Sequence, residues 1–281
     1  MKIRILGSGG GEGFPATFCT CEHCEEARRV GGKSLRSLHQ TLINDDLVID
    51  FPVDTDAHCR RYGVNLGKIQ NFLITHPHSD HYAPISLVCR GSLFAHNLKY
   101  EKTFFYGSEG LERIFDSAVA PYGIDATIRS NIGFVTMNDR QTEKVGAYTV
   151  TALKAEHAPH LNSLNYVISD GKVNVLYLID SGYPTKANLD YLNVQNYVFD
   201  CVVMDATMGY APVGEYVYHM GFEENKILKT ELISRGLATI DTKFVATHFT
   251  HNKAETHDKI EAIYNGTDFI IAYDGIEIDV G

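Results

Sequence analysis

The segment NFLITHPHSDHY, residues 71–82, joins a short apolar run to four possible metal ligands, and it is the part of the chain that predicts the fold. The run NFLIT predicts a strand, and the proline after His76 disfavours a helix. Residues i and i+2 of an extended chain project to the same side, so His76 and His78 can bind one ion. A turn would then bring Asp80 and His81 to a second ion. Imidazole and carboxylate donors of this kind suit Zn, Mn or Fe.

The composition indicates a globular protein. The 281 residues carry 25 Lys and Arg against 35 Asp and Glu, a net charge of −10, and contain no apolar run near the ~20 residues of a membrane span. The first residues also lack the hydrophobic core of a signal peptide, so we expect a cytoplasmic protein that does not bind membranes. The absence of a basic stripe argues against extended nucleic acid as a partner. A small anionic phosphate ester fits, because bound metal ions would supply positive charge. The sequence leaves open whether the chain forms a homodimer.

Short apolar runs bounded by turn residues predict more strands than helices. The expected strands are 2–6, 41–51 as two runs, 71–75, 103–107, 148–154, 165–170, 174–180, 201–206, 243–248 and 269–274. The expected helices are 22–30, 82–96, 108–119, 184–193, 222–235 and 254–264. We expect one domain over residues 1–281, with two packed sheets and helices on the outer faces. Residues 82–130, rich in aromatic side chains, are expected to form a lid or insertion.

With its H-x-H-x-D-H segment, the chain resembles the metallo-β-lactamase superfamily along nearly its whole length. The resemblance implies an α/β fold, a four-layered αβ/βα sandwich, with a dinuclear metal site at the strand ends. It also implies three further ligands in chain order: a histidine after a later strand, a bridging aspartate and a late histidine. The residues that match are His157, with His160 as the alternative, then Asp180 and His248.

The resemblance divides these ligands between two ions that share Asp180 and a bridging hydroxide. His76, His78 and His157 would hold the first ion, and Asp80, His81 and His248 the second. Asp50 in LVIDF matches the acidic residue that the family carries after an early strand. We interpret Asp50 as a partner that orients a metal-bound histidine.

Three cysteines in CTCEHC predict a second, structural metal site. Cys19, Cys21 and Cys24 form a C-x-C-x2-C cluster ahead of an expected helix. Closely spaced thiolates favour a closed tetrahedral zinc site, which requires a fourth ligand. We expect His251, three residues after His248, to be that ligand, with His23 as the alternative. A redox pair fits this spacing less well.

Several further segments resemble the phosphodiesterases that open phosphoribosyl 1,2-cyclic phosphate in phosphonate breakdown. They are GSGGGEGFP, CTCEHC with a following RR, THPHSDH, LIDSG, THFTH and the terminal YDGIEI. The resemblance implies hydrolysis of a small cyclic phosphate diester by a metal-bridging hydroxide. It assigns catalytic roles to Asp80 and His219, the latter at the phosphate or the leaving sugar oxygen.

Two other functions remain open. One is a superfamily diesterase acting on nucleotide or RNA phosphodiesters. The other is a non-catalytic metal-binding or carrier protein similar to the coenzyme PQQ biosynthesis B protein, whose H-x-H-x-D-H segment is degraded. The chain has no G-x-G-x-x-G loop and no G-x-S-x-G elbow, so a nucleotide loop and a serine hydrolase lack support. We expect the glycines of GSGGGEG to let the backbone pass close to the metal-binding loop.

Overall fold

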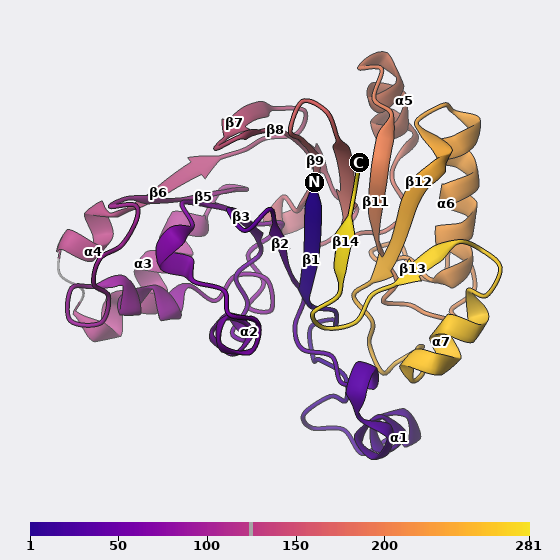
Figure 1. Cartoon of the computed structure of the whole chain (residues 1–281), viewed down its shortest axis with the longest axis horizontal. Coiled ribbons are helices and arrows are strands. Elements are labelled where there is room, and N and C mark those ends of the chain that lie inside the picture. Colours follow the sequence, from indigo (N-terminus) through magenta and orange to yellow (C-terminus); the bar gives the residue numbers. More distant parts are fainter. Residues whose placement is uncertain (124–125) are drawn as a thin grey trace.

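Two seven-stranded sheets packed face to face form the body of the protein in the computed structural model, which describes residues 1–123 and 126–281 (Figure 1). The first sheet has the order β14 (Glu277–Asp279), β1 (Lys2–Gly7), β2 (Gln40–Ile43), β3 (Leu47–Ile49), β4 (Asn71–Leu73), β5 (Thr103–Gly107) and β6 (Ile132–Thr136). The second has the order β13 (Phe269–Ile271), β12 (Ala238–Thr247), β11 (Phe199–Asp205), β10 (Asn174–Leu178), β9 (Leu164–Ser169), β8 (Tyr148–Lys154) and β7 (Thr142–Val145).

Both sheets are mixed, and most of the predicted ligands follow parallel strands, whereas His157 follows the antiparallel strand β8. In the first sheet β3, β4, β5 and β6 run parallel. In the second sheet, the parallel strands are β10, β11, β12 and β13. Parallel neighbours end at the same edge of a sheet, so residues that follow these strands gather there.

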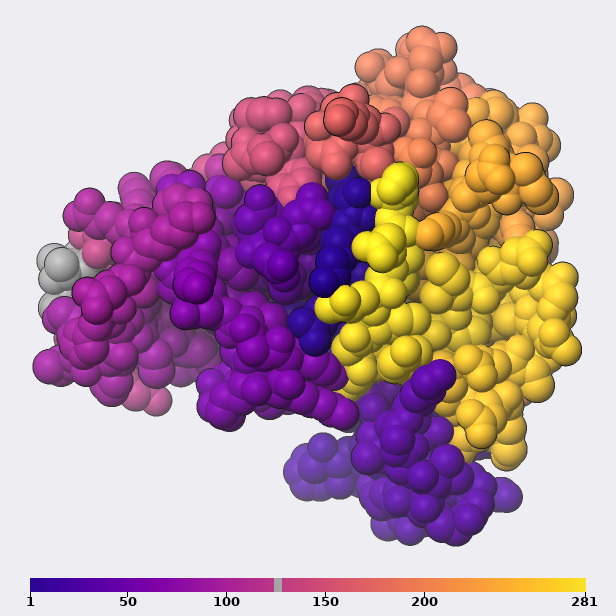
Figure 2. Space-filling view, in the orientation of Figure 1, coloured from indigo at the N-terminus to yellow at the C-terminus, as the bar shows by residue number. Residues whose placement is uncertain are grey.

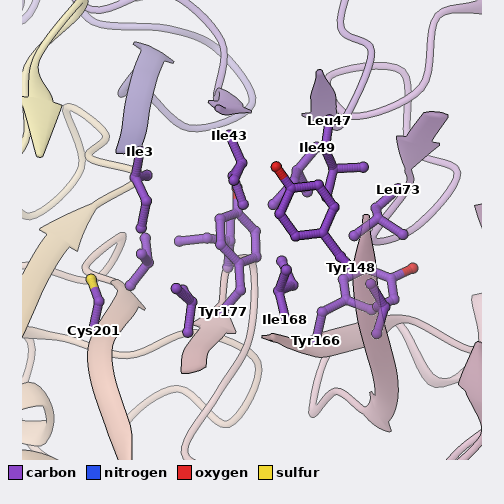
Figure 3. Packing of buried hydrophobic residues seen from close by; sticks show 14 of the residues in the cluster. Ile3, Ile43, Leu47, Ile49, Leu73, Tyr148, Tyr166, Ile168, Tyr177 and Cys201 are labelled. Atoms are coloured by element: carbon purple, nitrogen blue, oxygen red, sulfur yellow. The ribbon is translucent and has the colours of Figure 1, made fainter. Parts of the chain in front are cut away.

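The main core lies between the two sheets and follows from alternating apolar residues. Val175 and Tyr177 of β10 face the other sheet, whereas Leu176 and Leu178 face the helices. Figure 3 shows side chains of both sheets meeting in this layer. The hydroxyl of Tyr166 donates to the carbonyl oxygen of Ile74 across the layer at 2.6 Å, so this buried polar group is satisfied.

Helices cover the outer faces of both sheets. Helices α5 (Lys186–Val194) and α6 (Phe222–Ser234) pack on the second sheet, and α3 (Leu111–Val119) packs on the first. This arrangement confirms the predicted αβ/βα sandwich. The remaining helices are α1 (Glu22–Val30), α2 (Thr55–Tyr62), α4 (Ala126–Ser130), α7 (His257–Ile263) and the 3₁₀ turns η1 (Gly32–Ser34), η2 (Leu66–Lys68), η3 (Pro84–Arg90), η4 (Ala120–Tyr122) and η5 (Pro159–Leu161). Within the described ranges, none of the helices reaches the length and hydropathy that crossing a bilayer requires.

The predicted helix over 82–96 is wrong. The chain forms only the 3₁₀ turn η3, and Gly91 then adopts an extended backbone, which ends the helical geometry. Helix α2 and strands β6, β7 and β14 were not predicted, because their short and mixed sequences carry little periodicity. Part of the segment 82–130 belongs to the first sheet, because its strand β5 lies between β4 and β6. A role of this segment as a lid stays a prediction.

Candidate metal centre

The predicted ligands follow strands that end at one edge of the sandwich. Strand β4 is followed by His76, His78, Asp80 and His81. Strand β10 is followed by Asp180, and β12 is followed by His248. Three residues just past strand ends, Asp50 (φ 67°), Asp180 (φ 52°) and His248 (φ 66°), adopt left-handed backbone conformations. Such conformations are costly for residues other than glycine and concentrate at functional sites.

The first donor set consists of His76, His78, His157 and Asp180, whose ligand atoms all lie within 4.8 Å of one another. Nε2 of His76 lies 2.9 Å from Nδ1 of His78 and 3.2 Å from Oδ2 of Asp180. Nε2 of His157 lies 3.3 Å from the same carboxylate oxygen. The alternative His160 is exposed in η5 and lies outside this set.

The second donor set consists of Asp80, His81, Asp180 and His248. Nε2 of His81 lies 3.2 Å from Oδ2 of Asp80 and 3.3 Å from Oδ2 of Asp180. Nε2 of His248 lies 3.4 Å from Nε2 of His81. Oδ2 of Asp180 therefore faces both donor sets, the position that a bridging ligand requires.

Both donor sets fit divalent metal ions. Each offers imidazole nitrogens and carboxylate oxygens aimed at a common point, the donor types that Zn, Mn and Fe accept. Four of these side chains, His76, His81, Asp180 and His248, expose 4% or less of their surface. Nitrogens and oxygens this close together at such burial are costly unless they are protonated and hydrogen-bonded or bind cations.

Two hydrogen-bonded partners orient the histidines of the second set. Nδ1 of His81 donates to Oδ2 of Asp50 at 2.7 Å, and Asp50 also accepts from the backbone N–H of Thr75 at 2.8 Å. This is the position predicted for Asp50. Nδ1 of His248 lies 2.7 Å from the hydroxyl of Thr207. In both histidines Nε2 is thus left free to act as a metal ligand.

Burial and charge set the protonation of the cluster in the metal-free protein. Burial lowers the pKa of His157 to about 4 and also lowers the pKa of His76. Burial opposes protonation of His81 as well, but the surrounding carboxylates, Asp50 first among them, raise its pKa well above the usual value. For Asp180, burial would raise the pKa, but the neighbouring histidines, led by His248, hold it well below the ordinary range.

His219 lies beside the other carboxylate oxygen, Oδ1 of Asp180, and forms a third, overlapping donor group with Asp180, Asp205 and His248. Its Nδ1 is 3.0 Å from Oδ1 of Asp180 and 3.3 Å from Oδ2 of Asp205. Its ring is 4.9 Å from the ring of His157 and 6.4 Å from that of His248. Burial opposes its protonation, but the two carboxylates raise its pKa to about 10. The ring therefore lies beside the donor sets with Nδ1 held by two carboxylates, which leaves Nε2 for a substrate oxygen.

Asp205 is a residue of this site that sequence reasoning missed. It is fully buried at the end of β11, between the strands that lead to Asp180 and His248. Its Oδ1 accepts from the backbone N–H of Thr207 at 2.9 Å, and its Oδ2 accepts from the Thr207 hydroxyl at 3.0 Å. A signal was present, since a buried aspartate that closes an apolar run such as CVVM rarely lacks a polar partner.

The cysteine cluster and His251 form a separate donor set. Nδ1 of His251 lies 3.4 Å from Sγ of Cys19 and 3.5 Å from Sγ of Cys21, and Cys24 completes the set within 4.8 Å. The alternative ligand, His23, instead lies 3.3 Å from Glu255. Three sulfurs and one nitrogen fit a tetrahedral zinc ion. The segment that carries the cysteines projects from the body of the molecule (Figure 2).

The glycine turn packs against both metal-binding loops, as its sequence predicts. The N–H of Gly10 donates to Phe249 at 2.9 Å. A Cβ atom at Gly10 would lie 2.6 Å from Thr250, and one at Gly11 would lie 3.1 Å from Oδ2 of Asp80. Only glycine allows this close approach without displacing a neighbour.

The model of the family described as Anti-Pycsar protein Apyc1 matches residues 37–259. The chain belongs to this family. No curated protein matches the chain significantly.

Solved structures agree on the fold. A diphosphatase from the PhnP family superposes with a TM-score of 0.73 at 18% identity, covering 100% of this chain and 98% of that one. Zn²⁺-bound PqqB from Methylobacterium extorquens superposes with a TM-score of 0.69 at 16% identity, and the match covers 100% of both chains. YhfI from Bacillus subtilis, a metallo-β-lactamase fold protein, superposes with a TM-score of 0.66 at 20% identity. The match covers 99% of this chain and 98% of YhfI. The metallo-β-lactamase fold is therefore confirmed.

Proposed function

We propose that this chain is a dinuclear metal-dependent phosphodiesterase that hydrolyses a small cyclic phosphate diester. The observation that carries the proposal is the position of Asp180, whose Oδ2 faces both donor sets while Oδ1 faces His219. Membership of the Apyc1 family and the likeness to a PhnP-family diphosphatase support phosphate chemistry.

Each donor set would hold one divalent ion, Zn, Mn or Fe. Such ions supply Lewis acidity toward a phosphate and lower the pKa of bound water toward neutrality. Asp180, which both sets share, would fix their spacing, and Asp80 would be a ligand of the second ion. His219, with Nδ1 held by two carboxylates, presents Nε2 to the phosphoryl oxygen or to the leaving alkoxide and donates a proton there.

Two substrates share this chemistry. The Apyc1 family match favours a cyclic nucleotide, and the sequence motifs favour phosphoribosyl 1,2-cyclic phosphate. The net charge of −10 argues against a large RNA. The complete donor sets argue against a non-catalytic carrier similar to PqqB.

The test is hydrolysis followed by phosphorus NMR with Mn- or Zn-loaded protein. The substrates are nucleoside 3′,5′- and 2′,3′-cyclic monophosphates, phosphoribosyl 1,2-cyclic phosphate and a linear aryl diester. We expect metal-dependent turnover of a cyclic diester that is lost in Asp80→Ala. Turnover of the linear ester alone would overturn the cyclic specificity. No turnover by metal-loaded protein would overturn the proposal.

A further inference from the structure

Gln40 is a buried polar side chain that the proposed chemistry does not use. It begins β2, exposes 1% of its surface, and forms three hydrogen bonds with residues of α2 and of the segment after β3. A buried amide is costly unless its polar atoms are paired, so three bonds at one side chain fix a single orientation. One of the groups that it contacts is the backbone of Asp50, the residue that orients His81.

The bond to Asp50 continues the pairing of two strands at the point where the sheet ends. Strands β2 and β3 pair in antiparallel register through Thr41 and Ile49, so Gln40 and Asp50 would form the next pair. Asp50 instead adopts a left-handed backbone (φ 67°), and β3 stops before it. Nε2 of Gln40 donates to the carbonyl oxygen of Asp50 at 3.1 Å, so the side chain satisfies this buried backbone group.

The peptide unit that Gln40 contacts also touches the second donor set. It joins Asp50 to Phe51, and its N–H donates to the carbonyl oxygen of His81 at 2.7 Å. The Asp50 side chain, at one end of this peptide, accepts from Nδ1 of His81 at 2.7 Å. The same peptide unit therefore contacts the backbone of His81 directly and its ring by way of Asp50.

Two residues of α2 fix the amide of Gln40. Nε2 donates its second hydrogen to Oγ1 of Thr55 at 3.0 Å, and Oε1 lies 2.7 Å from Nδ1 of His58. An amide oxygen can only accept, so Nδ1 of His58 is the donor. Nε2 of the same ring lies 2.7 Å from the hydroxyl of Ser37. Thr55 and His58 each expose 2% of their surface, so bulk water does not compete for these bonds.

We infer that Gln40, held by His58, is a positioning residue of the second donor set: it fixes the backbone of Asp50 so that its carboxylate meets Nδ1 of His81. This inference rests on the proposed function, because it requires His81 to bind a metal ion. A left-handed aspartate is costly and persists only where its surroundings hold it. Without the bond from Gln40, we expect the Asp50 carboxylate to shift and the His81 ring to lose its fixed orientation.

Manganese titration of the protein stripped of its metal ions tests the inference without measuring turnover. Mn²⁺ prefers carboxylate to thiolate donors, so it reports on the two sets that contain aspartate. Free Mn²⁺, measured by electron paramagnetic resonance, gives the affinity for each ion. Gln40→Met keeps the length of the side chain without its polar atoms, and we expect it to weaken the binding of one ion about tenfold.

The two failures of this titration are distinguishable. Native affinity for both ions in Gln40→Met would overturn the inference and leave the diesterase proposal standing. Failure of the native protein to bind two ions would instead overturn the dinuclear centre of the proposed function.

A control variant separates positioning from a general loss of stability. The hydroxyl of Thr242 donates to the carbonyl oxygen of Phe199 at 2.7 Å, at the opposite end of β11 and β12 from Asp205 and His248. Thr242→Val removes this buried bond, so it should lower the melting temperature of the metal-free protein and leave both Mn²⁺ affinities unchanged. A loss of affinity equal to that of Gln40→Met would assign the effect to stability and overturn the inference.

Two substitutions at His58 test whether the fixed amide matters, and they do so even if Gln40→Met does not fold. His58→Asn retains an N–H near the position of Nδ1, whereas His58→Leu has none. We expect the leucine variant to weaken the same ion, by less than Gln40→Met, and the asparagine variant to bind both ions with native affinity. Equal affinities in the two variants would overturn the inference.

A double-mutant cycle identifies the residue through which Gln40 acts. Asp50→Ala removes the carboxylate that orients His81. If Gln40 acts through this carboxylate, adding Gln40→Met to Asp50→Ala should not weaken Mn²⁺ binding further. Additive losses would overturn the inference, because Gln40 would then affect the metal centre by another route.

Discussion

Nδ1 of His219 lies 3.0 Å from Oδ1 of Asp180, whereas Oδ2 of the same carboxylate faces both metal donor sets. One aspartate therefore connects the metal centre to the residue placed to donate a proton. Asp205 lies 3.3 Å from the same nitrogen, so two carboxylates fix the orientation of the ring.

His219→Gln is expected to lower kcat by about 10²- to 10⁴-fold, because it removes a general acid without removing a metal ligand. Metal content, measured by plasma mass spectrometry, should stay at the native value. His160→Gln, an exposed change nearby, is the control and should keep full activity. A large loss of bound metal in His219→Gln would contradict the assignment, since His219 would then be a ligand.

Asp205→Asn is expected to lower kcat by about 10- to 100-fold because Asp205 orients His219. Loss of a residue that hydrogen-bonds to an active side chain typically reduces activity by this factor. A double-mutant cycle with His219→Gln checks the coupling. If Asp205 acts through His219, the double variant should be no worse than His219→Gln. Additive losses would show that Asp205 acts elsewhere, for example through Thr207 and His248.

Asp50→Asn is expected to weaken metal binding about 10- to 100-fold at one of the two sites, because it removes the negative charge that holds Nδ1 of His81. Competition with a chromogenic chelator would show one ion that binds more weakly than in the native protein and one whose affinity is unchanged. Asp56→Asn, an exposed carboxylate paired with Arg60, is the matched control. Unchanged affinity at both sites would contradict the orienting role.

Cys21→Ser is expected to remove one zinc and also to lower activity. His251 and His248 lie three residues apart, and Phe249 between them forms backbone hydrogen bonds with Gly10 and Ser8, so we expect a zinc ion at the cysteine site to brace the loop that carries His248. Zinc stoichiometry and kcat/KM measured on the same preparation check both effects. Full activity with one zinc lost would contradict the bracing role.

Thiol alkylation of the zinc-free protein should distinguish two of the cysteines by pH. The contact with His251 lowers the pKa of Cys21 to about 6, and burial raises that of Cys24 to about 12. The thiolate is the reactive form, so Cys21 should be fully reactive above about pH 7 and slow below pH 5. Cys24 should stay unreactive at pH 8. Peptide mass spectrometry after iodoacetamide treatment measures both rates.

Two controls accompany the alkylation experiment. Added zinc should protect Cys21, and His251→Ala should shift its midpoint upward toward the ordinary thiol value. Equal rates for both cysteines at pH 7 would contradict the assigned environments.

Local patterns in the chain were sufficient to predict the fold class and most metal-binding residues. In THPHSDH and CTCEHC the donors are only one to three residues apart, so chain geometry alone brings them together. The run VLYL of β10 is apolar without interruption, so it predicts a strand that is buried on both faces, between the other sheet and the helices. Short or irregular elements could not be predicted: the segment 82–96 contains only the 3₁₀ turn η3, because backbone geometry at Gly91 overrides its helical spacing.

Relationships between distant residues required the folded chain. His157 and His160 are equivalent as sequence, but only His157 lies beside Asp180. Asp205 has no motif around it, and its role arises because β11 lies between β10 and β12, which places its carboxylate against His219. Most donor residues can therefore be predicted from short stretches of sequence. The sharing of Asp180 and the placement of His219 depend on strand order, because parallel strands collect residues from remote segments at one edge.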